Sequence, residues 1–189
     1  TDPLTWVLLY AALVMLVIRN NQRLGHVLLI IVSALACVVI VSFVADGVVK
    51  PAVGRLRPCN DPALAGWIDT VWGVEERSFS FFSAHSANTF SLAVFLAFLV
   101  RSRTLTVWLM VWSLLNSYSR IYLGVHYPGD ITVGLLWGAL VGWGVYRFFY
   151  CRFSRPAAYS QRHCLVPAVV LLLTFTFAVI KALYLIYSA

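Results

Sequence analysis

The chain has 189 residues, of which 61% are hydrophobic and 11% are charged, and its formal net charge is +7. Its mean hydropathy of +0.86 is too high for a soluble domain, and several apolar runs approach the roughly 20 residues that cross a bilayer. The composition therefore excludes a soluble globular protein and predicts an integral membrane protein.

Six apolar runs, taken in chain order, predict six transmembrane helices. They cover residues 4–18, 26–49, 85–100, 104–122, 130–150 and 165–187. These spans use nearly the whole chain, so we expect an all-α membrane bundle that forms one domain over residues 1–189. Prolines and glycines interrupt the one long connection, residues 50–84. The sequence starts at Thr1 without a basic leader, and we expect no signal peptide.

Charge assigns the two faces of this bundle. Eight arginines and no acidic residue lie in the connections after the first, third and fifth predicted helices, so that face is cytoplasmic by the positive-inside rule. The eight are Arg19, Arg23, Arg101, Arg103, Arg147, Arg152, Arg155 and Arg162. The acidic residues lie at or near the other face: Asp2, Asp46, Asp61, Asp69, Glu75, Glu76 and Asp130. We therefore expect the loop 50–84 on the extracytoplasmic (periplasmic) face of a bacterial cytoplasmic membrane.

Two function classes find little support. The positive charge is explained largely by topology, so we expect no nucleic-acid partner. The four cysteines, Cys37, Cys59, Cys151 and Cys164, show no metal-ligand spacing, and Cys59 has no partner on its face for a disulfide. We expect no metal and no cofactor. The sequence does not indicate an oligomeric state.

Basic residues on the outer face break the charge pattern, beginning with the stretch KPAVGRLRP from Lys50 to Pro58. A lysine offers a mobile point charge and an arginine a rigid fork of donors, which suits the anionic oxygens of a phosphate. Taken alone, the stretch is more simply interpreted as cations that snorkel to lipid headgroups. Asp46 stands one helical turn before Lys50, and we expect the two to pair.

The stretch FFSAHSANTF, residues 81–90, opens the third predicted helix. Ser83 is the expected N-cap, which leaves the backbone N–H groups of Ala84, His85 and Ser86 at the positive end of the helix dipole. That arrangement binds anions, and His85 could donate a proton to a leaving oxygen. An ordinary cap beside an interfacial histidine explains this stretch equally well.

The third stretch, SRIYLGVHYPGD, runs from Ser119 to Asp130 between the fourth and fifth predicted helices. A tight turn at Pro128 and Gly129 would bring Asp130 to His126, where a carboxylate fixes the imidazole tautomer and activates the other nitrogen as a nucleophile. Arg120 would reach the same end of its helix. The alternative is a buried polar pair that stabilises a helical hairpin. Because topology places all three stretches on one face, one phosphate site explains them together.

These three stretches resemble the signature of the type 2 phosphatidic acid phosphatase superfamily, the membrane lipid phosphate phosphatases. The similarity rests on Lys50-x6-Arg57-Pro58, Ser83-x-His85 and Ser119-Arg120-x5-His126-x3-Asp130. The family's second part usually reads Pro-Ser-Gly-His, and Phe82 and Ala84 replace its proline and glycine here. Ala84 keeps its backbone N–H, so we expect anion binding to survive.

The resemblance implies a metal-independent phosphoryl transfer in two steps. His126 would attack phosphorus to form a phosphohistidine, Asp130 would orient it, and His85 would protonate the departing oxygen. The phosphate-binding groups would be Lys50, Arg57, Ser83, Ala84, His85 and Arg120. Preorganised donors of this kind would take the place of a metal.

The expected substrate is a lipid phosphate, held with its tails among the membrane lipids. The resemblance favours undecaprenyl pyrophosphate or phosphatidylglycerol phosphate, with lipid A phosphate as an alternative. Residues 59–82 are the candidate for headgroup selection, with Trp67, Trp72, Glu75, Glu76 and Arg77, whose acids we expect to be solvated. Two other classes stay open: a non-enzymatic lipid transporter or scaffold, and the vanadate-dependent halide oxidation of soluble proteins with a similar site.

Overall fold

The computed structural model describes residues 3–64, 67, 76, 78–154 and 158–187, and every regular element in them is a helix. Several residues singled out in the sequence lie outside the described part: Asp2, Asp69, Trp72, Glu75, Arg77 and Arg155. The prediction of an all-α fold is confirmed for the part that the structure describes.

The helices match the predicted apolar runs, with two extensions through π-helical turns. Short 3-10 segments are η1 (Pro3–Trp6), η3 (Pro58–Asn60) and η4 (Pro62–Leu64). The longer elements are α1 (Val7–Asn20), α2 (Leu24–Ser42) with η2 (Phe43–Val49) and α3 (Lys50–Val53), α4 (Ala84–Val100), α5 (Arg103–Tyr122), α6 (Pro128–Gly144) with η6 (Val145–Tyr150) and α7 (Cys151–Phe153), and α8 (Gln161–Tyr187).

The apolar helices are those of a membrane protein. Three helical stretches are long and apolar enough to cross a bilayer: Leu24–Leu64, Pro128–Phe153 and Gln161–Lys181. Two more, Val7–Asn20 and Ala84–Val100, are apolar but shorter. α5 has 20 residues, but serine, threonine and asparagine make it less apolar. Six spans therefore stay a prediction.

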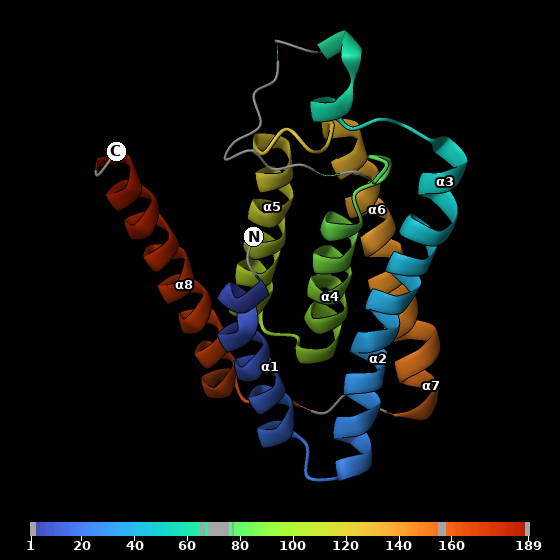
Figure 1. Ribbon diagram of the computed structural model, residues 1–189. Helices are drawn as coiled ribbons and strands as arrows, with labels where there is room; N and C mark the ends of the chain where they lie inside the picture. Colours follow the sequence, from blue (N-terminus) through green and yellow to red (C-terminus); the bar gives the residue numbers. More distant parts are fainter. Residues whose placement is uncertain (1–2, 65–66, 68–75, 77, 155–157, 188–189) are drawn as a thin grey trace.

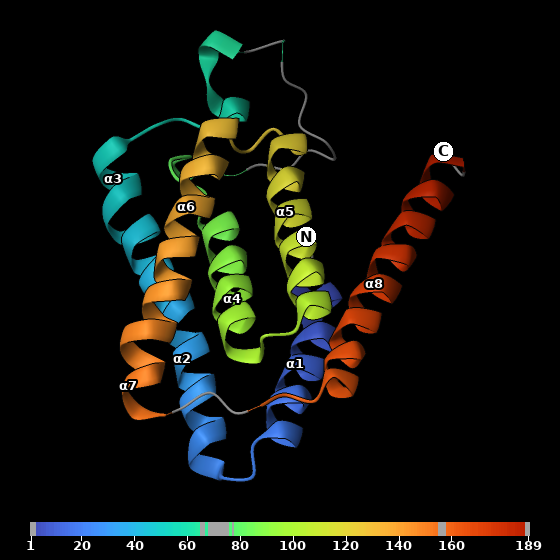
Figure 2. The same ribbon diagram turned by 180° about the vertical axis from the view of Figure 1, so that it is seen from behind.

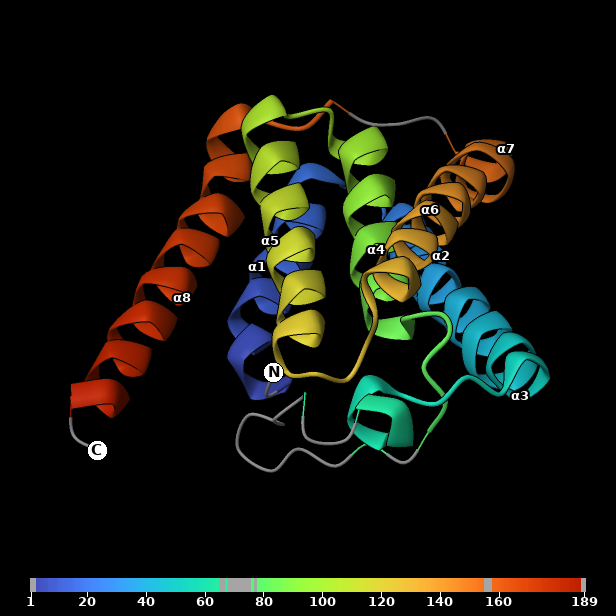
Figure 3. The same cartoon turned by 90° about the horizontal axis from the view of Figure 1, so that it is seen from above.

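α4 stands at the centre of the bundle (Figure 3). It packs most extensively against α6, and also against α5 and α2. α8 contacts α1 and α5, and its C-terminal end leans away from the other helices (Figures 1 and 2). The core therefore lies around α4, whose first turn belongs to the second motif stretch.

Small residues let α4 and α6 approach each other closely. A Cβ atom at Gly134 would lie 2.7 Å from the carbonyl oxygen of Ser83, and one at Gly138 would lie 2.5 Å from that of Ala87. Real Cβ atoms do not come this close, so only glycine fits at these positions. Close approach of backbones across small residues at every fourth position is a frequent packing mode of membrane helices.

The connections separate into two groups at opposite ends of the bundle. α3, the segment after it and the link between α5 and α6 lie at one end, while the α1–α2, α4–α5 and α7–α8 links lie at the other (Figure 1). The described arginines of the predicted cytoplasmic face lie in the links of the second group or in the helix ends next to them. The three motif stretches thus meet at one end, as predicted from the helix order.

Candidate active site

Lys50 begins the short helix that extends α2 beyond its π-helical turn. Its side chain is buried, and Nζ lies 2.6 Å from Asp46 Oδ1, as the spacing predicted. Gly54 ends the helix in the left-handed conformation at φ 62°, which glycine adopts without strain. The chain can therefore turn back across the end of the bundle with Arg55 and Arg57.

Arg57 belongs to this segment and is 4% exposed. Nε and Nη2 donate to the Ser78 backbone carbonyl and hydroxyl oxygens, both at 2.8 Å. Nη1 donates to the Val125 carbonyl oxygen at 3.1 Å and lies 3.2 Å from His126 Nε2. Lys50 and Arg57 are both buried, which does not fit cations that snorkel to lipid headgroups.

The first turn of α4 supplies the second part of the site. Ser83 is the N-cap as predicted, and its hydroxyl oxygen accepts from the Ser86 N–H at 3.4 Å. The expectation that the Ser86 N–H is free is therefore wrong. The N–H groups of Ala84 and His85 have no acceptor within the helix, as in any first turn. Ser83 also donates its own N–H to the Asp130 carbonyl oxygen at 3.1 Å, which ties α4 to α6.

Among the residues predicted for the site, His85 is exposed. The charged groups whose fields reach its imidazole are Arg120, Glu76, His126 and Lys50. Arg120 is 8% exposed at the end of α5 and is reached in turn by the charges of Glu76 and Arg57. Lys50 and Arg120 thus act electrostatically on His85, and Arg57 lies 3.2 Å from His126, so cations from two of the stretches lie near the two histidines.

His126 and Asp130 lie side by side, with Nδ1 3.5 Å from Oδ2. The tight turn predicted at Pro128 is wrong, because Pro128 is the first residue of α6 and Tyr127 is its N-cap. Proline suits this position, since its missing N–H would have no helical acceptor. Asp130 is the third residue of the helix, and Oδ2 accepts from the Tyr127 N–H at 3.0 Å. Helix capping thus fixes the carboxylate next to the imidazole.

Two further residues hold Asp130, and the sequence interpretation assigned neither to the site. The Ser80 hydroxyl donates to Asp130 Oδ2 and lies 3.4 Å from His126 Nδ1. Arg55 donates to Asp130 Oδ1 at 3.1 Å, and its guanidinium stacks 3.9 Å from the centre of the Tyr127 ring. Arg55 was visible as an outer cation in the first stretch. Ser80 is a serine in a polar loop, and no local pattern distinguishes it.

The burial of His126 favours the neutral form of its imidazole. The residue is 3% exposed, and burial lowers the pKa of His126 below the ordinary value, while the hydrogen bond to Asp130 raises it. With Nδ1 facing Asp130 and Ser80, Nε2 keeps its lone pair and faces Arg57. A neutral imidazole in this tautomer can act as a nucleophile through Nε2, which lies 3.2 Å from Arg57 Nη1.

Glu76 brings a negative charge next to Arg57. Its Oε2 lies 3.6 Å from Arg57 Nη2, so the expectation that the loop acids are merely solvated is wrong for this residue. Trp67 is 86% exposed, and the remaining loop candidates lie outside the described residues. Among the described residues, no group of three histidine, cysteine or acidic side chains is placed to hold a metal ion.

Comparison with known proteins gives a family match. The description of the PAP2 superfamily matches residues 23–154. This region contains every residue of the site described above. No solved structure matches the chain.

Three curated relatives show which proteins the chain is similar to. It is 35% identical to a lipid A 4'-phosphatase of Bacteroides thetaiotaomicron over 77% of the chain and 65% of the relative. It is 33% identical to a lipid A 4'-phosphatase of Porphyromonas gingivalis over 80% of the chain and 64% of the relative. It is 38% identical to undecaprenyl-diphosphatase BcrC of Bacillus subtilis over 36% of the chain and 35% of the relative. The chain thus matches just under two thirds of the length of the two lipid A phosphatases.

Proposed function

Because this chain belongs to the PAP2 superfamily, we propose that it is a membrane phosphatase that hydrolyses the phosphate of a lipid headgroup. The observation that carries the proposal is the position of His126. Nδ1 faces Asp130 at 3.5 Å and Nε2 faces the Arg57 guanidinium at 3.2 Å. A nucleophilic nitrogen beside a cluster of buried cations suits attack on a phosphoryl group.

In the first step the His126 Nε2 lone pair forms a bond to phosphorus, and the bond from phosphorus to the lipid oxygen breaks. His85, at the exposed side of the site, gives its proton to that oxygen. Asp130 and Ser80 hold Nδ1 and stabilise the positive charge that develops on the ring. The product is a phosphohistidine and a free lipid alcohol.

In the second step His85, deprotonated in the first, takes a proton from water, the water oxygen forms a bond to phosphorus, and the bond from phosphorus to His126 Nε2 breaks, which releases phosphate and restores both histidines. Lys50, Arg57, Arg120 and the first turn of α4 hold the phosphoryl oxygens in both steps, with the Ser83 hydroxyl and the Ala84 and His85 N–H groups as donors. Preorganised donors at such a centre stabilise a transition state by about 3 kcal/mol each. The cations supply the electrostatic stabilisation, so we expect the reaction to proceed without a divalent metal.

The proposed substrate is a lipid A 4'-phosphate. The support is the similarity to two lipid A 4'-phosphatases over more than three quarters of the chain. Undecaprenyl diphosphate is the second candidate, because the chain is also similar to an undecaprenyl-diphosphatase over a shorter region. Phosphatidylglycerol phosphate, which the sequence interpretation favoured equally, has less support from these relatives.

The proposed topology is a single domain of six spans with the site at the extracytoplasmic face. The support is the separation of the two ends of the bundle, since the arginine-bearing connections lie opposite the site (Figure 1). A headgroup could then reach His126 from the outer leaflet while its chains stay in the bilayer.

Phosphate release from purified protein in detergent tests the proposal. The panel is lipid A, undecaprenyl diphosphate, phosphatidylglycerol phosphate and phosphatidic acid, each with EDTA. We expect the fastest release from lipid A and a loss of activity in His126→Ala of at least about a thousandfold. Activity that requires a divalent metal, or that persists in His126→Ala, would contradict the mechanism. A panel on which the wild type is inactive would favour the transporter or scaffold alternative.

A further inference from the structure

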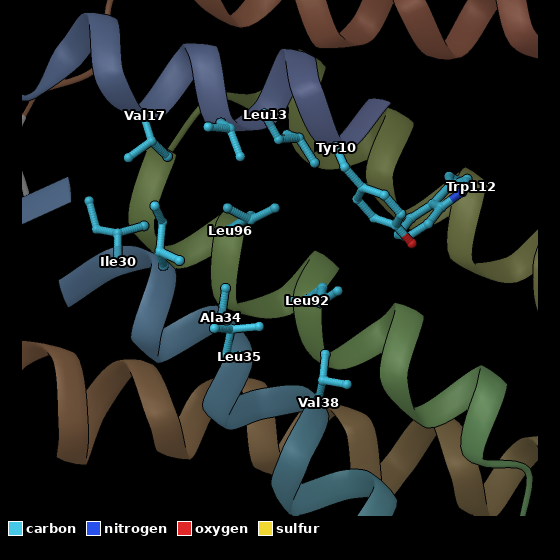
Figure 4. A pocket seen from close by; sticks show the side chains of 12 residues that line it. Tyr10, Leu13, Val17, Ile30, Ala34, Leu35, Val38, Leu92, Leu96 and Trp112 are labelled. Atoms are coloured by element: carbon cyan, nitrogen blue, oxygen red, sulfur yellow. The ribbon is translucent and has the colours of Figure 1, made fainter. Parts of the chain in front are cut away.

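A cavity of about 330 Å³ lies within the apolar part of the bundle (Figure 4). Four helices form its walls: α1, α2, α4 and α5. The residues that mark its extent are Tyr10, Val17, Ile30, Val38, Leu96 and Trp112.

The lining allows an apolar ligand and no other. Tyr10 and Trp112 carry the only polar side-chain atoms among the lining residues, and the rest are aliphatic. A dry cavity of about 150 Å³ with such walls admits a benzene-sized molecule, and this one is larger. At this depth of a membrane protein the abundant apolar molecule is a hydrocarbon chain.

One face of α4 leads from the phosphate site to this cavity. His85, Thr89, Leu92 and Leu96 follow at intervals of four, three and four residues, which places them on one side of the helix. Leu92 and Leu96 line the cavity. With a rise of 1.5 Å per residue, Leu92 lies roughly 10 Å below His85 along the helix.

The facing side of α5 follows the same course. Arg120, Asn116 and Trp112 are spaced by four residues and are all buried, and Trp112 lines the cavity. Between them the Thr89 hydroxyl of α4 meets the Ser113 hydroxyl of α5 at 2.9 Å. Along these two helix faces, the side chains are basic near the phosphate site, carry hydroxyl and amide groups in the middle, and are apolar at the cavity.

The cavity is also open to the surrounding lipid. Val14 of α1 and Leu35 of α2 line it, yet they are 44% and 59% exposed. α1 and α2 are joined at the end far from the site and diverge from there (Figure 1). A chain can thus enter sideways between these two helices.

We propose that this cavity binds one hydrocarbon chain of the lipid substrate while its phosphate lies among Lys50, Arg57 and Arg120. The inference rests on the proposed function and adds a chain-recognition site to it. The occupant is a substrate chain, and not a chain of the bulk bilayer, because the cavity lies on the two helix faces that begin at His85 and Arg120. Binding there would make activity depend on the lipid chain as well as on the headgroup.

Filling the cavity tests this site. Ala34→Phe from α2 and Val14→Phe from α1 add a ring to opposite walls. Ala11→Phe is the matched control, because Ala11 is an exposed residue of α1 that does not line the cavity. We expect both filling variants to lower kcat/KM about tenfold, the effect of excluding about two methylene groups, for the panel lipid that the wild type cleaves fastest. Both filling variants should cleave the same phosphorylated headgroup, without its hydrocarbon chains, at the wild-type rate.

A binding measurement separates the substrate chain from bulk lipid and does not need turnover. Phosphatidic acid with brominated chains should quench the Trp112 fluorescence, taken as the difference between wild type and Trp112→Phe. Phosphatidylcholine with the same chains should not. Equal quenching by the two lipids, or none, would overturn the proposal. It would also be overturned if the two filling variants lost as much kcat/KM on the chain-free substrate as on the lipid. Failure of the proposed function is a different result, namely a wild type that releases no phosphate from any substrate.

Discussion

Arg55 and Asp130 form an ion pair through the carboxylate oxygen that does not face His126, with Arg55 Nη1 3.1 Å from Oδ1. The other oxygen accepts from Ser80 and from the Tyr127 N–H. The Asp130 side chain is fully buried, so its charge depends on these partners. Asp130 is therefore held on both oxygens, and Oδ2 also lies 3.5 Å from His126 Nδ1.

Replacement of Arg55 should lower catalysis without removing a group that touches phosphate. Arg55→Ala leaves one buried carboxylate oxygen without its charged donor, and such hydrogen bonds contribute about 1.5–3 kcal/mol. We expect kcat to fall about tenfold or more and KM to change little. Arg55→Lys should recover part of the loss. Arg23→Ala, an exposed arginine at the other end of the bundle, is the control, and an Arg55→Ala enzyme with wild-type kcat would contradict this role.

Ser80 should act together with Arg55, because both orient the same carboxylate. We expect Ser80→Ala to lower kcat about tenfold, since the hydroxyl contacts both Asp130 and His126 Nδ1. The double variant with Arg55→Ala should lose less than the product of the two single losses, because residues in one network are not additive. A double-mutant cycle on kcat measures the difference. Independent, multiplicative losses would show that the two residues do not share a function.

The acidic side of the pH profile should report on His126. Burial lowers the pKa of its imidazole below the ordinary 6.5, so the nucleophile should stay neutral, and kcat should hold, down to a pH below that value. Asp130 raises this pKa, so Asp130→Asn should move the acidic limb to still lower pH while it lowers the maximal rate. The measurement is kcat from pH about 4 to about 8. An acidic limb above 6.5 in the wild type would contradict a buried neutral His126.

The lowered pKa of His126 also makes the stability of the fold depend on pH. An unfolded chain binds a proton at His126 as the pH falls through 6.5, whereas the folded chain with its lowered pKa does not. The free energy of unfolding is therefore not reduced by this group above pH 6.5, and it decreases as the pH falls from 6.5 to the lowered pKa.

Glu76 should compete with the phosphate for Arg57. The 3.6 Å ion pair occupies a donor that the substrate needs, and the negative charge repels an incoming anion. Glu76→Gln should therefore lower the inhibition constant of vanadate by roughly fivefold at low salt, and less at high salt. Asp46→Asn is a useful comparison, because Asp46 pairs with Lys50 in the same cluster. Weaker vanadate inhibition in Glu76→Gln would mean that the carboxylate supports anion binding.

A methyl group at Gly138 should destabilise the protein. Its Cβ would meet the Ala87 carbonyl oxygen at 2.5 Å and the Ala87 Cα at 3.1 Å, and overpacking of this kind costs about 1–3 kcal/mol. The matched control is Gly144→Ala in the same helix, where a Cβ has open space. We expect the melting temperature in detergent to fall for Gly138→Ala and to hold or rise for Gly144→Ala. Equal effects would mean that the contact between α4 and α6 can relax.

The helices, their order and the gathering of the three stretches were predictable from the sequence. Apolar runs fix where a helix crosses the membrane, and alternation of the links between two faces then places Lys50, His85 and His126 at one end. The N-cap at Ser83 was predictable too, because a serine before an apolar run satisfies the first N–H groups.

The partners of Asp130 were not predictable. Arg55 and Ser80 reach it from a loop whose path depends on tertiary contacts, such as the Ser80 N–H donating to the Arg55 carbonyl oxygen at 2.8 Å. The cavity was equally hidden, because its walls come from four helices. The prediction of a tight turn at Pro128 was wrong, because proline is common in turns but is also common as the first residue of a helix, as it is in α6.

The close contact between α4 and α6 has a consequence for how the protein would respond to bilayer thickness. Helices meet a thicker or thinner bilayer by tilting. α4 and α6 would have to tilt together, because Gly134 and Gly138 leave no space between them and Ser83 donates to the Asp130 backbone. His126 and the first turn of α4 would then keep their geometry in membranes of different thickness, while the cavity between α1 and α2 could widen or narrow.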